Sequence, residues 1–334
     1  MPNDQKSELR TKSLSPTAQT ISAVIPCYCE KNQILDVINK FDSAITNIII
    51  IDDACPEKTG EFVLTNNNDD RVQVITHKIN QGVGGATVTG YTKAIELGSD
   101  IIVKVDGDGQ MDPTMIQTLI GPIQRGEADY AKANRFYRLK GLSKMPLLRL
   151  IGNLLLSFAS KMSSGYWKIF DPTNGFTAIH GKVAQELPLD KLHKGYFFES
   201  DMLFHLNLSR AVVVDVPIQA IYGNEKSSLK VSKILLPFSG LHLKNFIRRI
   251  TYSYFLHDFS IASIELIIGL IFVTFGCIFG GIEWYESSIS GITASAGTVI
   301  IAALPLMVGS QLLISFLNFD VNNQPDQLLH KNLK

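Results

Sequence analysis

The sequence of 334 residues has no excess of charge of either sign, because 31 Lys and Arg residues balance 31 Asp and Glu residues. A protein that binds nucleic acid usually carries a basic excess on one face, so the composition favours no nucleic-acid partner. Cysteine is also scarce, and the four thiols lack the second close pair that a zinc site would need. We expect Cys27, Cys29, Cys55 and Cys277 to be small buried thiols in a reducing compartment.

The N-terminus lacks an apolar run. Residues 1–20 are rich in Ser, Thr, Lys and Gln, so we expect a mobile tail and not a secretory signal. Charged residues make up only 19% of the chain, whereas hydrophobic residues make up 46%. This imbalance indicates apolar segments beyond a soluble core, and they are found toward the C-terminal end.

Residues 21–230 alternate between two hydrophobic patterns. Short apolar runs predict strands at 21–25, 47–51, 72–76, 101–105 and 211–216. Apolar residues at helical spacing predict helices at 30–44, 59–64, 85–97, 115–124, 147–162 and in a segment ending near 208. The alternation favours an α/β domain whose parallel sheet is covered on both faces. Ligands of such sheets bind beyond the carboxyl ends of the strands, where polar clusters follow three of these runs.

The segment 231–257 mixes apolar residues with cations such as Lys244, Arg248 and Arg249. This pattern is typical of amphipathic helices that lie on a membrane surface with their cations toward anionic headgroups. We therefore expect interfacial helices after the α/β domain.

Two long apolar segments follow, at 259–282 and 291–319, and they contain one charge between them, Glu265. Roughly 20 apolar residues suffice for a helix to cross a bilayer. The sequence therefore predicts a two-span hairpin over 258–320 and a tail over 321–334.

Flanking charge predicts the orientation of the hairpin. Cations precede the first span and follow the second, whereas the connecting loop offers only Glu283 and Glu286. By the positive-inside rule both ends are cytoplasmic, which places the α/β domain where nucleotide sugars and Mg²⁺ are available. Two spans in each chain also make a homo-oligomer plausible.

The segment 106–110 (DGDGQ) follows an apolar run that is interrupted only by Lys104. Two carboxylates two residues apart, Asp106 and Asp108, on a turn with glycines suit a hard divalent cation, which needs one or two protein carboxylates besides phosphate oxygens and water. A solvated acidic turn is the alternative interpretation of so short a motif.

Seven segments together resemble the family 2 glycosyltransferases, and specifically the branch of polyprenyl-phosphate sugar synthases similar to dolichol-phosphate mannose synthase. In chain order they are 24–30 (VIPCYCE), 50–53 (IIDD), 80–86 (NQGVGGA), 106–113 (DGDGQMDP), 134–136 (NRF), 171–176 (DPTNGF) and 195–199 (GYFFE). The first and fourth motifs are specific in combination. The resemblance covers about residues 21–230 and implies a nucleotide-sugar-binding domain of the GT-A type.

By position, the resemblance assigns the donor nucleotide to the first two motifs. Pro26, Tyr28 and Glu30 would line the base and ribose of a UDP- or GDP-sugar. Asp53 would contact the base or ribose, with Asp52 as its neighbour.

The resemblance also assigns the chemistry. Asp106, Asp108 and Gln110 would hold the Mg²⁺ or Mn²⁺ ion that bridges the two phosphates, and Arg135 would approach the diphosphate or the acceptor phosphate. Asp108, Arg135 and Glu199 are the expected catalytic residues, although Glu199 in its motif is equally suited to packing or helix capping.

The acceptor decides whether a base is required. A lipid phosphate has a second pKa near ~6 and is already ionised at neutral pH, so it needs none. A sugar hydroxyl on a lipid-linked or surface glycan would need a carboxylate base, for which Glu199 and Asp201 are candidates. The favoured expectation is inverting transfer of a hexose to polyprenyl phosphate. A non-catalytic membrane scaffold is the third alternative, and the paired carboxylates of 106–110 argue against it.

Overall fold

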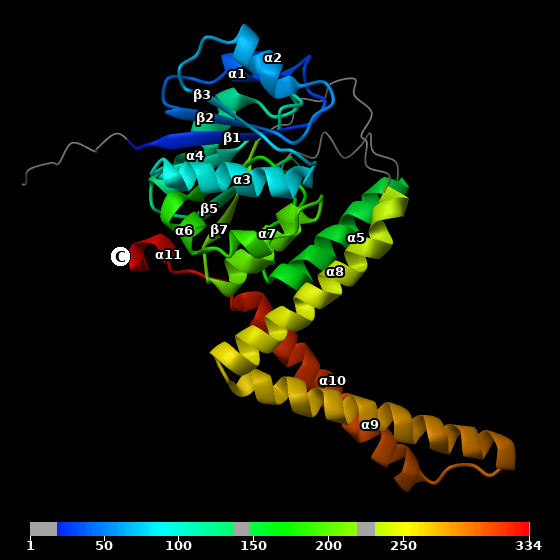
Figure 1. Ribbon diagram of the computed structural model, residues 1–334. Helices are drawn as coiled ribbons and strands as arrows, with labels where there is room; N and C mark the ends of the chain where they lie inside the picture. The colour runs from blue at the N-terminus through cyan, green and yellow to red at the C-terminus, as the bar shows by residue number, and fades with distance from the viewer. Residues whose placement is uncertain (1–18, 136–146, 219–230, 334) are drawn as a thin grey trace, which may run out of the picture.

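The computed structural model describes residues 19–135, 147–218 and 231–333, and the predicted N-terminal tail lies almost wholly outside them (Figure 1). A seven-stranded sheet forms the centre of the α/β domain. Its strands are β1 (Ile21–Cys27), β2 (Asn47–Asp52), β3 (Val72–Thr76), β4 (Ile101–Lys104), β5 (Tyr130–Asn134), β6 (Thr177–His180) and β7 (Val213–Pro217). Neighbouring strands follow the order β3-β2-β1-β4-β6-β5-β7.

All neighbouring strands are parallel except β6, which is antiparallel to both β4 and β5. The prediction of a parallel sheet is therefore right for β3-β2-β1-β4 and wrong for β6. The hydrophobic pattern also misses β5 and β6. The sequence of β5, YAKAN, contains two polar residues, and β6 has only four residues, so neither forms a recognisable apolar run. Both become strands because pairing satisfies their buried backbone groups.

Helices cover both faces of the sheet. One face packs against α1 (Ile34–Asn39), α2 (Thr59–Asn66) and α4 (Ile116–Gln124), and the other against α3 (Gly82–Glu96), α6 (Gly181–Glu186) and α7 (Phe198–Leu208). Side chains of β1 alternate between the two, since Ile25 packs in the first core and Val24 in the second. Two short 3₁₀ turns, η1 (Pro113–Met115) and η3 (Leu189–Lys191), complete the domain. The predicted α/β class is confirmed.

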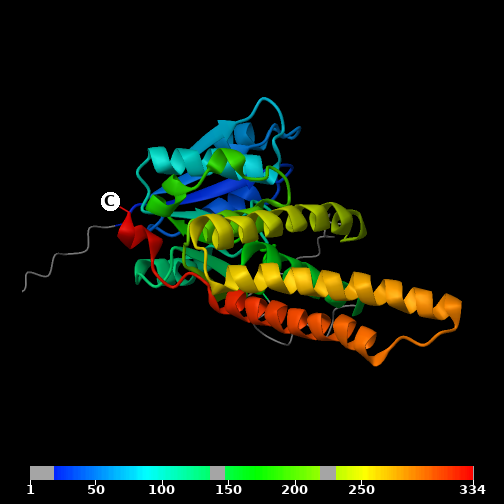
Figure 2. The same ribbon diagram turned by 90° about the horizontal axis from the view of Figure 1, so that it is seen from below.

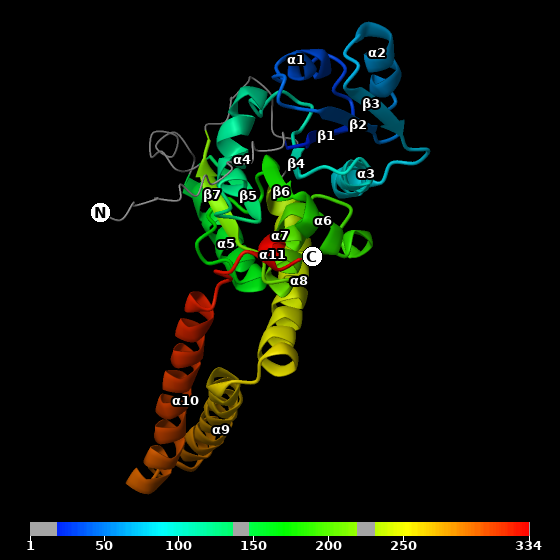
Figure 3. The same cartoon turned by 90° about the vertical axis from the view of Figure 1, so that its left-hand side faces the viewer.

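Two further helices connect this domain to a projecting hairpin, which is formed by two more. Helix α5 (Leu147–Ser164) packs against α8 (Val231–Thr251), which continues through a π-helical turn, η4 (Tyr252–His257). Helices α9 (Ile261–Ser290) and α10 (Ala296–Asn322) then form the hairpin, which extends away from the sheet (Figures 1 and 3). Both helices are long and apolar enough to cross a membrane, and each begins within five residues of its predicted span.

The residues after the hairpin pack onto the α/β domain. Helix α11 (Leu329–Asn332) returns to the side of α6 (Figures 2 and 3). Its backbone N–H groups at Leu329 and His330 donate to the fully buried Asp129 carboxylate at 2.8 and 3.0 Å, and the His330 ring stacks on His180 at 4.3 Å. Both ends of the hairpin are therefore attached to the same domain.

Glycines allow the two helices of the hairpin to approach closely. Gly269 and Gly276 of α9 and Gly309 of α10 are buried at their contact. Glu265, the charge inside the first predicted span, accepts a hydrogen bond of 2.9 Å from Ser315 Oγ in α10. A polar contact between helices thus accounts for this residue.

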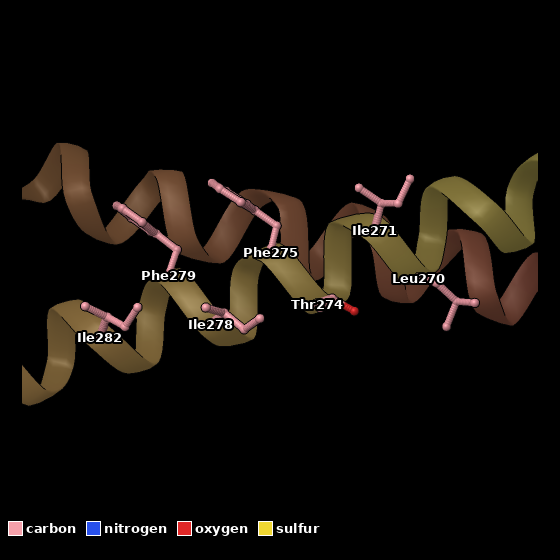
Figure 4. Close-up of a pocket in the computed structure, with 7 residues that line it drawn as sticks. All are labelled: Leu270, Ile271, Thr274, Phe275, Ile278, Phe279 and Ile282. Atoms are coloured by element: carbon pink, nitrogen blue, oxygen red, sulfur yellow. The ribbon is translucent and has the colours of Figure 1, made fainter.

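The outward face of α9 carries an apolar hollow (Figure 4). It is lined by Leu270, Ile271, Thr274, Phe275, Ile278, Phe279 and Ile282. The rings of Phe275 and Phe279 stack in parallel with their centroids 5.6 Å apart. A lining with a single hydroxyl offers almost no hydrogen bonds to a polar ligand, whereas polar side chains follow the carboxyl ends of the strands.

Candidate active site

The ends of β1 and β4 define the candidate site, because these strands are parallel neighbours and their following segments emerge side by side. Pro26 lies within β1, paired with Ile51 of β2, and Tyr28 follows it with half of its surface exposed. Asp106 and Asp108 are partly buried just beyond β4, and the exposed Gln110 donates its backbone N–H to Asp108 Oδ1 at 3.0 Å. The topology thus brings the first and fourth sequence motifs together.

Glu30 lies against the two aspartates. Burial, followed by the negative charges of Asp106 and Asp108, raises the pKa of Glu30 to about 9. Its buried Oε2 atom has no hydrogen-bond partner among the described residues. Glu30 therefore adds a third acidic group beside the paired carboxylates.

A buried lysine forms an ion pair with one of these carboxylates. Lys104, the last residue of β4, is fully buried on the sheet face that α7 covers, with its Nζ atom 2.6 Å from Asp106 Oδ1 and 3.4 Å from Glu199 Oε1. Burial alone would lower the pKa of Lys104, but the charges of Asp106 and Glu199 raise it above its ordinary value. One ammonium group therefore holds residues from two motifs in place.

The donor set fits a divalent cation of the Mg²⁺ type. Glu30, Asp106 and Asp108 supply more acidic groups than Lys104 can balance, and the orphaned oxygen of Glu30 lies beside them. Among residues 19–135, 147–218 and 231–333, no three His, Cys, Asp or Glu side chains are close enough to enclose a metal. One or two carboxylates with phosphate and water completing the shell is the usual arrangement for Mg²⁺.

Asp52 and Asp53 are engaged in holding the loops. Asp52 is buried and accepts hydrogen bonds from the backbone N–H groups of Cys55 and Gly60, both at 2.7 Å. Asp53, also buried, accepts bonds from the N–H groups of Gln81 and Gly82 at 2.8 and 2.7 Å. Asp53 also pairs with the ring of His77. These contacts give both aspartates a structural role, in addition to the contact with the donor nucleotide that the resemblance implies.

The glycine motif at 82–85 serves close packing. The N–H groups of Gly84 and Gly85 donate to Lys194 O, and a side chain on Gly84 would collide with His193 O. The start of α3 is thus occupied by Asp53 and by the segment that precedes the 195–199 motif. The first amides of this helix therefore already have partners within the protein.

Two of the expected catalytic residues have firm partners. Arg135, about one-third exposed, donates to both oxygens of Asp171 at 2.8 and 3.0 Å, which fixes the plane of its guanidinium. Glu199 is paired with Lys104. The other base candidate, Asp201, accepts bonds from Asn245 Nδ2 at 2.8 Å and His193 N at 2.9 Å.

The cysteines differ from the expectation of four buried thiols. Cys27 and Cys55 are buried, whereas Cys29 and Cys277 are exposed. Strand β1 ends at Cys27, and Cys29 follows with a positive φ of 62°, so the two thiols do not share a strand face. Cys277 is exposed on α9, where none of the described residues covers it.

Sequence reasoning did not assign a role to Lys104 or Lys132. Lys132 in β5 is fully buried, and burial lowers its pKa to about 8 while its Nζ atom donates to Asn174 O. For Lys104 the available signal is a charge that interrupts an apolar run, since a buried lysine requires a partner. Lys132 lies in β5, whose sequence forms no recognisable apolar run, so it carries no such signal. The partner's identity depends on strand order, which the sequence pattern leaves open.

A mixed sheet with paired carboxylates beyond its central strands defines the GT-A type of nucleotide-sugar-binding fold. Two solved structures of glucosyl-3-phosphoglycerate synthase from Mycobacterium tuberculosis share it, one in complex with UDP (TM-score 0.52) and one with Mn²⁺, UDP and glucosyl-3-phosphoglycerate (TM-score 0.51). Each is 20% identical in sequence, and each match covers 69% of this chain and 80% of the other.

Sequence comparison places the chain in a family. The glycosyl transferase family 2 model matches residues 22–187. The UDP-N-acetylglucosamine–dolichyl-phosphate N-acetylglucosaminyltransferase of Methanococcus voltae is 33% identical over 232 residues, which cover 65% of this chain and 92% of the relative. The undecaprenyl-phosphate mannosyltransferase of Micrococcus luteus is 26% identical over 202 residues (59% and 82%), and the dolichol-phosphate mannosyltransferase of Pyrococcus furiosus is 26% identical over 216 residues (63% and 59%). The chain belongs to glycosyl transferase family 2, in the branch of polyprenyl-phosphate sugar transferases.

Proposed function

We propose that the protein transfers a hexose from a UDP- or GDP-sugar to polyprenyl phosphate at the cytoplasmic face of a membrane, with inversion at the anomeric carbon. The names of three relatives carry this proposal, because each gives a dolichyl or undecaprenyl phosphate as the acceptor. The sugar and the nucleotide differ or are unnamed among them, so both donors are retained.

The arrangement of the carboxylates supports a metal-dependent reaction. Asp106, Asp108 and Gln110 would hold Mg²⁺ or Mn²⁺, as Mn²⁺ is present with UDP in the mycobacterial structure. A bound cation would neutralise charge on the departing nucleoside diphosphate. Lys104 keeps Asp106 in place for this task. Arg135 follows β5, and Asp171 orients its guanidinium, so it supplies a cation at the same edge of the sheet as Asp106 and Asp108. We call this edge, where the carboxyl ends of β1, β4 and β5 lie, the catalytic rim. Tyr28 offers an exposed ring to the donor base.

The partners of the two base candidates favour a phosphate acceptor. Glu199 is held by Lys104 and Asp201 by Asn245 and His193 N, so each carboxylate already has a structural function. A hydroxyl acceptor would need one of them to accept a proton. A phosphate acceptor is ionised at neutral pH and needs neither.

The surface of the α5–α8 pair supports a membrane location. Among the described side chains of α5, the buried ones are serines, namely Ser157, Ser160, Ser163 and Ser164, whereas Leu155 and Phe158 are 58% and 56% exposed. A helix in water presents the opposite pattern.

Helix α8 has the same inverted pattern. His242, Asn245 and Arg249 are buried, and Leu243 and Ile247 are more than half exposed. Exposed apolar side chains on two neighbouring helices that lead into the hairpin indicate immersion in the headgroup region. We therefore propose interfacial helices over 231–257 and a membrane-spanning hairpin over 258–320. We also propose that α5, which belongs to the 21–230 domain, forms part of the surface that contacts the membrane.

The attachment of both hairpin ends to one domain supports a two-span topology. If α9 and α10 each cross the membrane once, α8 and α11 must lie on the same side, and both pack on the catalytic domain. The cations at both ends favour the cytoplasm for that side. Association of the spans of several chains would make a homo-oligomer.

A transfer assay tests the proposal. Purified protein in liposomes would receive Mn²⁺, a polyprenyl phosphate and radiolabelled UDP- and GDP-sugars, with label followed into the organic phase. We expect label from one donor, lost with EDTA and with Asp108→Asn. Transfer to a glycan hydroxyl instead would favour the alternative acceptor and require Glu199. Absence of both transfer and Mn²⁺ binding would favour a non-catalytic scaffold.

A further inference from the structure

A buried polar cluster lies where the hairpin meets the catalytic domain. Its centre is Asp320, in the last turn of α10, with 3% of its surface exposed. Arg249 of α8 binds it with both terminal nitrogens, Nη1 to Oδ1 at 2.6 Å and Nη2 to Oδ2 at 3.0 Å. Tyr254 of η4 donates to Oδ1 at 2.7 Å, and Trp167, which follows α5, donates to Oδ2 at 3.1 Å. We call Asp320, Arg249, Tyr254 and Trp167 the junction cluster.

The junction cluster joins segments that are far apart in the sequence. Arg249 Nη2 also donates to Met162 O in α5 at 2.8 Å. The end of the second span is thereby bonded to the catalytic domain through α5, to α8, and to η4, which leads into the first span. The ring of Tyr254 also packs edge-on against Phe316 of α10, with centroids 5.0 Å apart.

The chemistry of this cluster favours fixed geometry over added stability. A buried ion pair contributes little to stability compared with well-packed apolar residues of similar size. However, the two carboxylate oxygens of Asp320 accept four hydrogen bonds, and each of these bonds requires a particular distance and direction. A slip of α10 by a single residue moves its side chains by about 1.5 Å along the axis and by more around it, which would break the bidentate contact. The cluster therefore admits one arrangement of hairpin and domain.

A fixed arrangement matters for a lipid substrate. A polyprenyl phosphate held in a bilayer keeps its phosphate at the level of the headgroups, whereas the carboxylates of the catalytic rim belong to a domain outside the bilayer. The two can meet only when the domain stands at one height and tilt. A water-soluble acceptor has no such requirement.

We propose that the junction cluster sets the height and tilt of the catalytic rim above the bilayer, so that Asp320 and Arg249 are positioning residues for a membrane-held acceptor. The acceptor part of this inference rests on the proposed function. Neither residue contacts the carboxylates of the rim.

Acceptor chain length tests the inference. Asp320→Asn keeps the shape of the side chain and removes its charge, and Arg249→Met removes the partner. Arg125→Met is the control, because it removes the same charge from an exposed position of the α/β domain, where the side chain is 60% exposed. Each variant would be reconstituted in liposomes and assayed with long-chain undecaprenyl phosphate and with short-chain, water-soluble citronellyl phosphate.

We expect Asp320→Asn and Arg249→Met to lower kcat/KM at least tenfold with the long-chain acceptor and less than twofold with the short-chain acceptor, at an unchanged KM for the donor. Arg125→Met should change neither value more than twofold. Equal losses with both acceptors would mean that the cluster serves folding alone, and no loss with either would remove its role in positioning.

A distance measurement keeps the inference testable even if the protein transfers no sugar to lipid. A fluorophore on α2, introduced as Leu64→Cys with Cys29→Ser and Cys277→Ser, would report energy transfer to labelled headgroups in nanodiscs. We expect one narrow distance distribution for this labelled protein and a broader distribution when it also carries Asp320→Asn. An unchanged distribution would overturn the inference, whereas a broadened one with inactive parent protein would refute only the proposed function.

Discussion

The buried Lys104 provides the sharpest test of how the active site is held together. Lys104→Met keeps the length and apolar volume of the stem and removes the ammonium group. With an effective dielectric constant of about 20, the Coulomb energy is about 6 kcal/mol for Asp106 at 2.6 Å and about 5 kcal/mol for Glu199 at 3.4 Å. The cost of burying the ammonium offsets much of this attraction.

The net effect should still be large. Removing one partner of a buried pair costs about 3–5 kcal/mol, because a charge is left without compensation. A change of 1 kcal/mol shifts Tm by about 2–4 °C in a domain of about 150–250 residues. We therefore expect Lys104→Met to lower the Tm of the catalytic domain by roughly 10 °C, measured by scanning calorimetry in detergent.

A surface lysine supplies the control. Lys93 pairs with Glu96 at 3.3 Å, but the two side chains are 33% and 59% exposed. Exposed pairs contribute about 1 kcal/mol or less, so Lys93→Met should shift Tm by less than about 3 °C. Equal shifts for the two variants would refute the argument that burial makes the Lys104 contacts important.

The pH dependence follows from the sign of the pKa shift. The pKa of Lys104 is held above its ordinary value of 10.5 in the folded protein. A group whose pKa is raised on folding stabilises the protein fully below its unfolded pKa and loses that effect as the pH rises through its folded pKa. The Tm difference between Lys104→Met and the parent should therefore stay constant from pH 6 to 9, and a difference that declines across this range would contradict the assignment.

Three further predictions concern the catalytic domain and α8. Gly175→Ala should lower kcat at least about a hundredfold, because its Cβ would collide with Lys104 Nζ, whereas Gly240→Ala, which has open space around it, should change kcat less than twofold. Burial lowers the pKa of His242 from 6.5 to about 4, so stability should fall by about 3 kcal/mol as the pH drops from 6.5 to 4, and a denaturant titration of His242→Gln should show a smaller loss. Asp108→Asn should abolish Mn²⁺ binding in a calorimetric titration without lowering Tm, because it relieves repulsion among neighbouring acidic groups, and a destabilised variant would count against that crowding.

Much of the site was predictable because strand ends are local features. Apolar runs followed by PCYCE, DD and DGDGQ mark the carboxyl ends of β1, β2 and β4, and parallel pairing brings such ends to one edge. The carboxylates at 106 and 108 could therefore be placed near Tyr28 and Glu30 before any coordinates. Long apolar segments likewise predict helices that can span a membrane, because length and composition decide this alone.

Other features depend on strand order and could not be predicted. The sequence shows that Lys104 interrupts an apolar strand, but its pairing with Glu199 requires α7 to cover that face of β4, 95 residues further along the chain. The antiparallel β6 inserts between β4 and β5 for the same kind of reason, since backbone pairing and not its four side chains makes it a strand.

The sequence by itself determined the α/β class, the acidic motif and the apolar hairpin, because each depends on residues that are close together along the chain. Only the tertiary structure decided that Asp53 binds the start of α3, that α11 returns to Asp129, and that Asp320 meets Arg249. Each of these contacts joins distant segments through a buried charge, and burial makes such a charge require a partner without specifying which one.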